Sequence, residues 1–210
     1  MKSENILNSL TWRYSAKIFD TTKKISDDDW NAIEDALILT PSSFGLQAWK
    51  FIVVQNPEMK EKLKNASYQQ SQVSDCSHLL VLCSKKDVTQ DDIDLYIDSI
   101  AKIRNVSLES LNGFKKYIVD TLMHLRPSMG AYLENQVFIA LGNVLTVAAM
   151  MKIDACPIGG FEREKYDEIL KLTDYTTSVV CPFGYRDSTD KYAQLKKVRY
   201  SKENLFEYIK

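Results

Sequence analysis

The chain has 210 residues, 45% of them hydrophobic, and its 27 basic and 28 acidic residues leave a formal net charge of -1. A chain of this size can bury a core, and we expect one domain over residues 1–210. The balanced charge excludes a strong field toward nucleic acid or a membrane, so neither is an expected partner. No apolar run approaches 18 residues and the N-terminus lacks the apolar segment of a signal peptide, which predicts a cytoplasmic protein.

The predicted secondary structure mixes helices and strands, with helix dominating. Helices are expected at 3–10 and 26–40; the second opens with Ser26 and Asp29, three positions apart as in a capping box, and stops before Pro41. Dense β-branched and aromatic residues predict buried strands at 50–55, 78–83 and 177–185. Helical periodicity covers four further segments: 57–65, 91–104, 107–124 and 129–151.

The longest predicted helix, 129–151, is apolar on most sides, so it must be buried on most sides. Glu134, Gln136 and Asn143 interrupt the apolar pattern, and small residues would permit close approach of another helix: Ala140, Gly142, Ala148 and Ala149. Two interpretations remain open, a central core helix and a helix at a dimer interface.

The residues that commonly carry catalysis are sparse. Four cysteines lie in apolar contexts without paired spacing, which predicts buried thiols: Cys76, Cys83, Cys156 and Cys181. The only histidines, His78 and His124, are too few for a metal site, and no nucleophile-elbow motif supports a hydrolase triad. The chain also contains no GxGxxG after a strand, so a Rossmann site for a dinucleotide is not supported.

Two cationic clusters lie near opposite ends of the chain. The sequence RYSAKIFD at 13–20 contains Arg13, Ser15 and Lys17, and KVR at 197–199 contains Lys197 and Arg199. Forked guanidinium, ammonium and hydroxyl donors together suit the several acceptor oxygens of a phosphate monoester. The alternative is a pair of solvated basic faces.

Two loops stand out because glycine and proline are few elsewhere. They read PSSFG at 41–45 and CPIGGFE at 156–162. Gly159 and Gly160 permit a close backbone approach that a side chain would block, so these N–H groups could reach a ligand. For either loop, a turn without a ligand is the alternative.

The order RYSAKIFD, PSSFGLQAWKFIVV, CPIGGFE and DKYAQLKKVR resembles the FMN-dependent nitroreductase family along almost the whole chain. The resemblance implies an α+β fold with a mainly antiparallel sheet flanked by helices and a long central helix at a homodimer interface. It also implies FMN as cofactor and NADH or NADPH as co-substrate. Hydride would pass to the flavin, and electrons then to a nitroaromatic, quinone or similar conjugated acceptor, in a ping-pong scheme that needs no catalytic side chain.

The same resemblance implies roles for particular residues. Positions matching the phosphate-contacting ones are Arg13, Ser15, Lys197 and Arg199, with Tyr14 in the same motif. Lys17 matches a position near the pyrimidine end of the flavin, where a cation would stabilise the charge of the reduced ring. The loop expected to reach the flavin from the partner subunit contains Pro41, Ser42 and Ser43. The remaining expected flavin neighbours are Gln69 and Gln72 at the pyrimidine edge, Pro157 and Ile158 beside the ring, and Gly159 and Gly160 near N5 and O4.

Three positions depart from the family pattern. Gln72 stands where lysine is frequent, Gly159 where glutamate is frequent and Ala48 where proline is common. Within 105–128, Phe114, Tyr117 and Ile118 are candidates either to touch substrate or to belong to the core. Three alternative functions stay open: reduction of a specific metabolite such as an enoate or pteridine, flavin binding without turnover, and a structural dimer that has lost flavin.

Overall fold

A four-stranded antiparallel sheet forms the centre of the computed structural model, which describes residues 3–210. Its strands lie in the order β1-β2-β4-β3. They are β1 (Trp49–Val54), β2 (His78–Lys85), β4 (Tyr175–Gly184) and β3 (Asp154–Ala155). The three predicted strands are confirmed with ends shifted by one or two residues. The short β3 was missed, because two residues carry too little alternation to be read from sequence.

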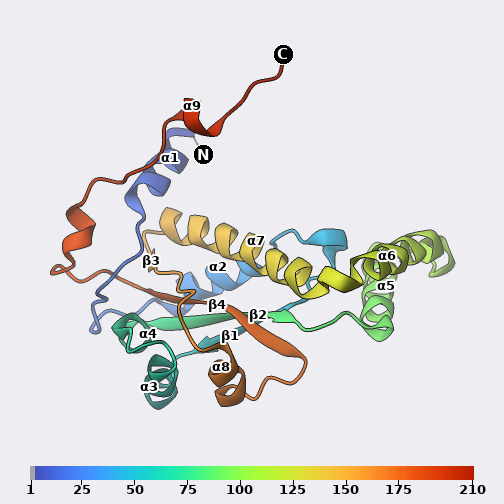
Figure 1. The fold of residues 1–210 in the computed structure, drawn as a ribbon, viewed down its shortest axis with the longest axis horizontal. Coiled ribbons are helices and arrows are strands. Elements are labelled where there is room, and N and C mark those ends of the chain that lie inside the picture. The colour runs from blue at the N-terminus through green and yellow to red at the C-terminus, as the bar shows by residue number, and fades with distance from the viewer. Residues whose placement is uncertain (1–2) are drawn as a thin grey trace.

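Alternate residues of the central strands face two different cores, because successive side chains of a strand point to opposite faces. On one face Leu80 and Leu82 of β2 pack with α2 (Asp27–Ile38) and the long helix α7 (Met129–Met150). On the other face Leu79 and Val81 pack with α3 (Pro57–Asn65), α4 (Ser71–Asp75) and α8 (Arg163–Ile169). Figure 1 shows α7 crossing one side of the sheet and α3 and α8 lying on the other.

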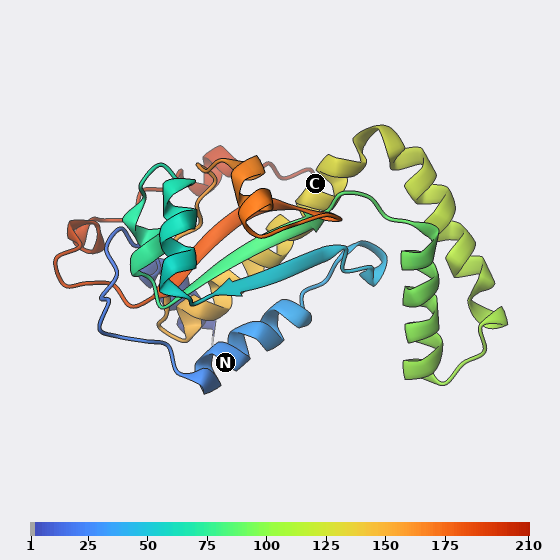
Figure 2. The same ribbon diagram turned by 90° about the horizontal axis from the view of Figure 1, so that it is seen from below.

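A helical hairpin of α5 (Gln90–Arg104) and α6 (Asn112–Leu125) projects from one end of the body, as Figure 2 shows. It forms a third apolar cluster with the start of α7. Ile118 is fully buried in that cluster, whereas Phe114 and Tyr117 are 36% and 60% exposed. Ile118 is therefore a core residue, and the other two retain a surface that another molecule can contact.

Other helix ends differ slightly from the prediction. Helix α1 (Ser3–Trp12) runs two residues further, and α6 starts at Asn112 because the preceding turn is the 3-10 helix η2 (Glu109–Leu111). Ser26 does cap α2, its hydroxyl accepting from the Asp29 amide at 3.2 Å. The short elements α4, α8 and α9 (Lys202–Leu205), and the 3-10 helices η1 (Ser43–Gly45), η3 (Arg126–Ser128) and η4 (Lys191–Gln194), were not predicted.

Helix α7 has a buried side and an open side. Eight of its residues are buried, among them Ala140, Ala148 and Ala149. The opposite side exposes Phe138 by 47% and Ile139 by 46%, and a Cβ added at Gly142 would meet nothing within 4 Å. Both interpretations of this helix therefore remain in force, since one face belongs to the core and the other is an uncovered apolar surface.

By length and composition alone, the helical stretch Glu109–Met150 is apolar enough to cross a membrane, with a mean hydropathy of 1.3 over 18 residues. The fold supplies another reason for that composition, because α7 packs along β2 and α2. A helix that packs against a sheet needs apolar residues on the side that it buries in the core.

The four cysteines are free and buried, as predicted. His78 is also buried and stacks on Trp30 at 4.2 Å between ring centroids. Burial lowers the pKa of His78 to about 4, so the ring is neutral at pH 7. Within residues 3–210, the side chains include no group of three or more His, Cys, Asp or Glu that could hold a metal ion.

Candidate functional site

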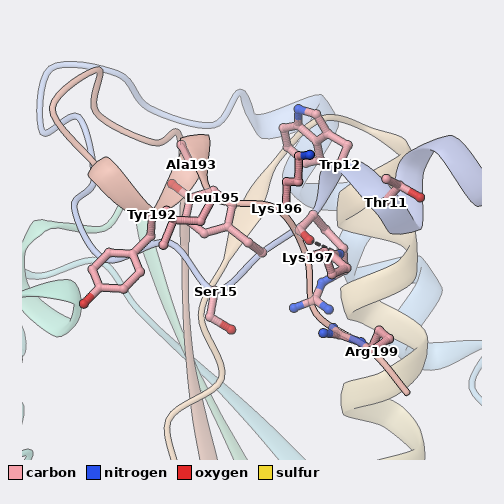
Figure 3. A pocket seen from close by; sticks show the side chains of 11 residues that line it. Thr11, Trp12, Ser15, Tyr192, Ala193, Leu195, Lys196, Lys197 and Arg199 are labelled. Carbon is pink, nitrogen blue, oxygen red and sulfur yellow. Dashed lines mark hydrogen bonds between the residues drawn. The ribbon is translucent and has the colours of Figure 1, made fainter. Parts of the chain in front are cut away.

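Segments from near the two ends of the chain meet at one cavity of about 610 Å³, shown in Figure 3. Segment 11–15, which begins in the last turn of helix α1, forms one wall, and residues of 192–199 form the other. The cavity therefore brings together both predicted cationic clusters, although they are far apart in sequence. Five predicted site residues line it: Arg13, Tyr14, Ser15, Lys197 and Arg199. Lys17 lies two positions beyond the lining segment, with its residue exposed.

The cavity carries an uncompensated positive charge. Its lining includes Arg13, Lys196, Lys197 and Arg199 and, among the residues described, no carboxylate. Burial lowers the pKa of Lys197, and the neighbouring Arg13 and Arg199 charges lower it further. Because the cations repel one another, an anion placed among them would stabilise all of them. The arrangement thus favours an anionic group.

Lys197 also has a structural task that the sequence did not indicate. Its ammonium donates to the Leu10 carbonyl at 2.5 Å and to the Arg13 carbonyl. These carbonyls lie at the C-terminal end of α1, where backbone oxygens lack helical partners and a cation is favourable. Lys197 therefore fastens the C-terminal segment to α1 while keeping its charge at the cavity wall.

The N-terminal motif also lies beside the Gly159–Gly160 loop. Ser15 forms a parallel bridge with Ala155, the last residue of β3, and Ile158 forms an antiparallel bridge with Val180 of β4. The Ile158 amide donates to the Val180 carbonyl at 2.8 Å. These bridges place 156–160 next to the N-terminal motif that contains Arg13 and Ser15.

The members of this loop differ in exposure. Gly159 and Gly160 are exposed, and a Cβ added at Gly159 would meet nothing within 4 Å. The Ile158 side chain, by contrast, is only 4% exposed and lies in the second core, while Pro157 is half-buried. Within the chain, the two glycines thus present their backbone to open space.

Gln70 holds the loop in place, although the sequence pointed instead to its neighbours. Its side-chain amide donates to the carbonyls of Gly160 at 2.8 Å and Ser67 at 3.0 Å. The amide of Gln69 donates to Asn65 at 3.0 Å, and Gln72 is half-buried. Three glutamines within four positions look alike in sequence, so no local signal could single out Gln70. Through Gln70, the 69–72 segment lies beside the glycine loop.

The loop with Pro41, Ser42 and Ser43 lies elsewhere in the same chain. The Ser43 amide donates to the Gln136 side chain of α7 at 2.8 Å. From Gln136 to the end of α7 at Met150 the helix rises about 21 Å, at 1.5 Å per residue, and only then does the chain reach β3 and the glycine loop. One chain therefore does not join this loop to the cationic cavity.

Backbone strain and aromatic contacts shape that loop. Phe44 adopts a φ of 59°, unusual for a residue with a side chain, and its carbonyl accepts from the Tyr96 hydroxyl at 2.5 Å. The Phe44 ring packs edge-on against Tyr117 at 5.7 Å and Phe114 at 6.5 Å. The exposed aromatics of α6 thus lie next to the predicted flavin-reaching loop.

Comparison with known proteins agrees with the motif order. The family model described as the nitroreductase family matches residues 10–185. The chain belongs to the nitroreductase family. A Staphylococcus saprophyticus member, provisionally named an NAD(P)H nitroreductase, is 34% identical over 98% of this chain and 97% of its own length.

Solved structures show the nitroreductase fold in the same way. An Exiguobacterium sibiricum structure, described as a nitroreductase in complex with FMN, has a TM-score of 0.82 at 21% identity, covering 100% of this chain and 98% of its own. A gut-bacterial enone reductase of fatty-acid saturation has a TM-score of 0.81 at 21% identity, covering both chains completely. These likenesses confirm the predicted fold class, an antiparallel sheet with flanking helices and a long central helix.

Proposed function

We propose that this member of the nitroreductase family is an FMN-dependent NAD(P)H oxidoreductase. The observation that carries the proposal is the cavity where Arg13, Lys197 and Arg199 converge from opposite ends of the chain without a carboxylate among the lining residues described. A phosphate monoester dianion would satisfy both the charge and the donors of that site. The related S. saprophyticus protein, provisionally named an NAD(P)H nitroreductase, supports the nicotinamide co-substrate.

The residues present fit FMN beyond its phosphate. The glycine loop adjoins the cavity through the Ser15–Ala155 bridge, and its exposed backbone leaves room for a flat ring. Gln69 and Gln72 flank Gln70, whose side chain donates to the Gly160 carbonyl, and their amide groups can both donate and accept. The E. sibiricum relative in fold is described in complex with FMN, which supports the same cofactor here.

Bound FMN would supply the redox chemistry, taking hydride from NADH or NADPH and passing electrons to a conjugated acceptor in a ping-pong scheme. The protein's part is to bind and orient the cofactor and to set its charge environment. Lys17, two positions beyond Ser15, would hold positive charge near the pyrimidine end of the ring. Gln72 in place of the frequent lysine supplies no second charge there, so we expect a somewhat lower flavin potential than with lysine.

We further propose a homodimer whose partner subunit completes each site. The predicted flavin-reaching loop lies away from the cavity of its own chain, so a second copy must bring it there. An uncovered apolar face of α7 is available for this contact, and the C-terminal segment exposes further apolar side chains, including Tyr200 by 80% and Ile209 by 96%. Exposed apolar patches of this kind mark interaction sites. Sedimentation equilibrium should give twice the chain mass, and a monomer that binds FMN fully would contradict the shared site.

Purified protein tests the function directly. It should be yellow, with a flavin spectrum that NADH or NADPH bleaches under anaerobic conditions and that menadione or a nitroarene restores. Steady-state NAD(P)H oxidation should then depend on the acceptor. Protein that binds FMN but shows no turnover with any acceptor would be a flavin-binding protein only. A colourless protein that fails to take up added FMN would refute the proposal.

Conjugated enones and enoates are a second class of candidate acceptor for the same assay. The enone reductase that shares this fold shows that the architecture supports reduction of a conjugated carbon–carbon bond. Conjugated enones and enoates should therefore be tested beside quinones and nitroarenes. The acceptor with the highest kcat/KM identifies the substrate class, since that ratio reports transition-state binding.

A further inference from the structure

Asp190 is a buried carboxylate at the junction of the two chain ends, with 2% of its surface exposed. One oxygen, Oδ2, accepts three hydrogen bonds from the N-terminal motif: the Tyr14 hydroxyl at 2.7 Å, the Lys17 amide at 2.7 Å and the Ile18 amide at 3.2 Å. The other oxygen, Oδ1, accepts from the Tyr192 amide at 3.0 Å at the start of η4. A single side chain thus organises both walls of the cationic cavity.

The ionised form of this carboxyl is favoured despite its burial. Burial by itself would raise the pKa of Asp190, but hydrogen bonds from Lys17, Tyr14, Ile18 and Tyr192 outweigh it and lower the pKa. Burial and the same contact raise the pKa of the Tyr14 hydroxyl, which keeps it a donor. Asp190 is consequently an anion with several fixed donors, which ties the backbone around residue 17 to one conformation.

We propose that Asp190 is a positioning residue: its carboxylate sets the conformation of residues 14–18 and so aims the donors of that motif at bound FMN. This inference rests on the proposed flavin site. Asp190 does not line the cavity itself, and its carboxylate oxygens accept hydrogen bonds from groups of the protein. It acts through the motif, above all through the backbone of Lys17 and the ring of Tyr14.

The sign of one mutational effect separates this role from simple electrostatics. Asp190→Asn removes a negative charge near a phosphate site, which by Coulomb attraction alone would strengthen FMN binding. The amide also places a donor against groups that already donate, so residues 14–18 or Tyr192 lose an acceptor. Positioning therefore predicts weaker FMN binding, by about tenfold or more, whereas a purely electrostatic role predicts tighter binding.

Asp187→Asn is the matched control, because it removes the same charge from the same turn. Asp187 accepts from the Thr189 amide at 2.8 Å and hydroxyl at 2.6 Å, not from the N-terminal motif through its side chain. Its FMN affinity should stay within about twofold of the unmodified protein, as for surface substitutions in general.

Hydrogen exchange of the apoprotein supplies a readout that needs no cofactor. In Asp190→Asn the amides of Lys17 and Ile18 should exchange about tenfold faster or more, since each loses a buried acceptor, while strand β2 should be unchanged. If the unmodified protein binds no FMN, the proposed function fails and this exchange measurement alone decides the positioning role. Unchanged FMN affinity together with unchanged exchange in a folded Asp190→Asn variant overturns the inference.

Tyr14→Phe keeps the test decisive if Asp190→Asn does not fold. This change removes one of the three donors to Oδ2 and leaves the carboxylate in place. We expect FMN binding about threefold weaker or more, for loss of one hydrogen bond to a charged group. Unmodified affinity in this variant would overturn the inference in that case.

Discussion

Arg13→Ala and Arg199→Ala should each weaken FMN binding by roughly 1.5–3 kcal/mol, the range for hydrogen bonds to charged groups. The reason is geometric, since these two arginines line opposite walls of the same cavity and come from opposite ends of the chain. Isothermal titration of apoprotein with FMN measures the change. Raising the ionic strength should weaken the unmodified protein's binding and reduce the difference between it and the variants, because salt screens charge.

Riboflavin distinguishes a phosphate site from a general loss of structure. It has the same ring without the phosphate, so its affinity should be nearly unchanged in both variants. Lys191→Ala serves as a control, because this exposed cation of η4 does not line the cavity; its effect should stay within about 0.5 kcal/mol. Equal losses for FMN and riboflavin, or unchanged FMN affinity in both arginine variants, would refute the phosphate site.

Asp154→Ala should lower the free energy of unfolding by about 3 kcal/mol, because it leaves a largely buried guanidinium without its carboxylate. Asp154 is 3% exposed and accepts from Arg186 through Nη2 at 2.6 Å and through Nε at 3.0 Å. The Arg186 guanidinium lies over the rings of Trp12 at 4.2 Å and Tyr14 at 4.5 Å. We expect the lower end of the known range, since the Arg186 side chain is 23% exposed.

Urea unfolding monitored by circular dichroism measures this loss of stability. Asp120→Ala is the comparison, because Asp120 forms an exposed ion pair with Lys116 one helical turn away, at 2.6 Å. Such surface pairs contribute at most about 0.5 kcal/mol. Equal stability of Asp154→Ala and Asp120→Ala would show that the stacked Arg186 does not depend on its carboxylate.

Several features of the fold could be read from the sequence because they repeat locally. The strands around Leu80 and Val180 carry dense apolar runs, and the long helix carries more apolar residues than one face requires. Short elements such as α4 and β3 were not predicted, because so few residues show no helical or strand periodicity in their apolar pattern. The start of α6 was placed too early because the 3-10 turn before it continues a helix-like pattern.

The candidate site was predictable as a set of residue types but not as an arrangement. Arg13 stands out in the sequence because it and Lys17 flank the hydroxyl of Ser15, and Arg199 because it ends the last motif of the family order. Gln70 carries no such mark, and Asp190 opens the DKYAQLKKVR motif without showing a role there, because Gly160 and Tyr14, the partners that reveal their roles, lie far away in the chain. Tyr14 and Asp190 are 176 positions apart, and only packing makes them partners.

The sequence by itself determined the family, the three long strands, the central helix and the identity of the cationic and glycine-rich segments. Those properties follow from local composition, periodicity and motif order. The tertiary structure decided that the chain ends share one cavity, that Lys197 also closes helix α1, and that the loop at Ser43 lies against Gln136 rather than beside that cavity. Such contacts depend on how the sheet and α7 orient segments far apart in sequence, because short-range hydrogen bonds and burial act only after folding has brought the groups together.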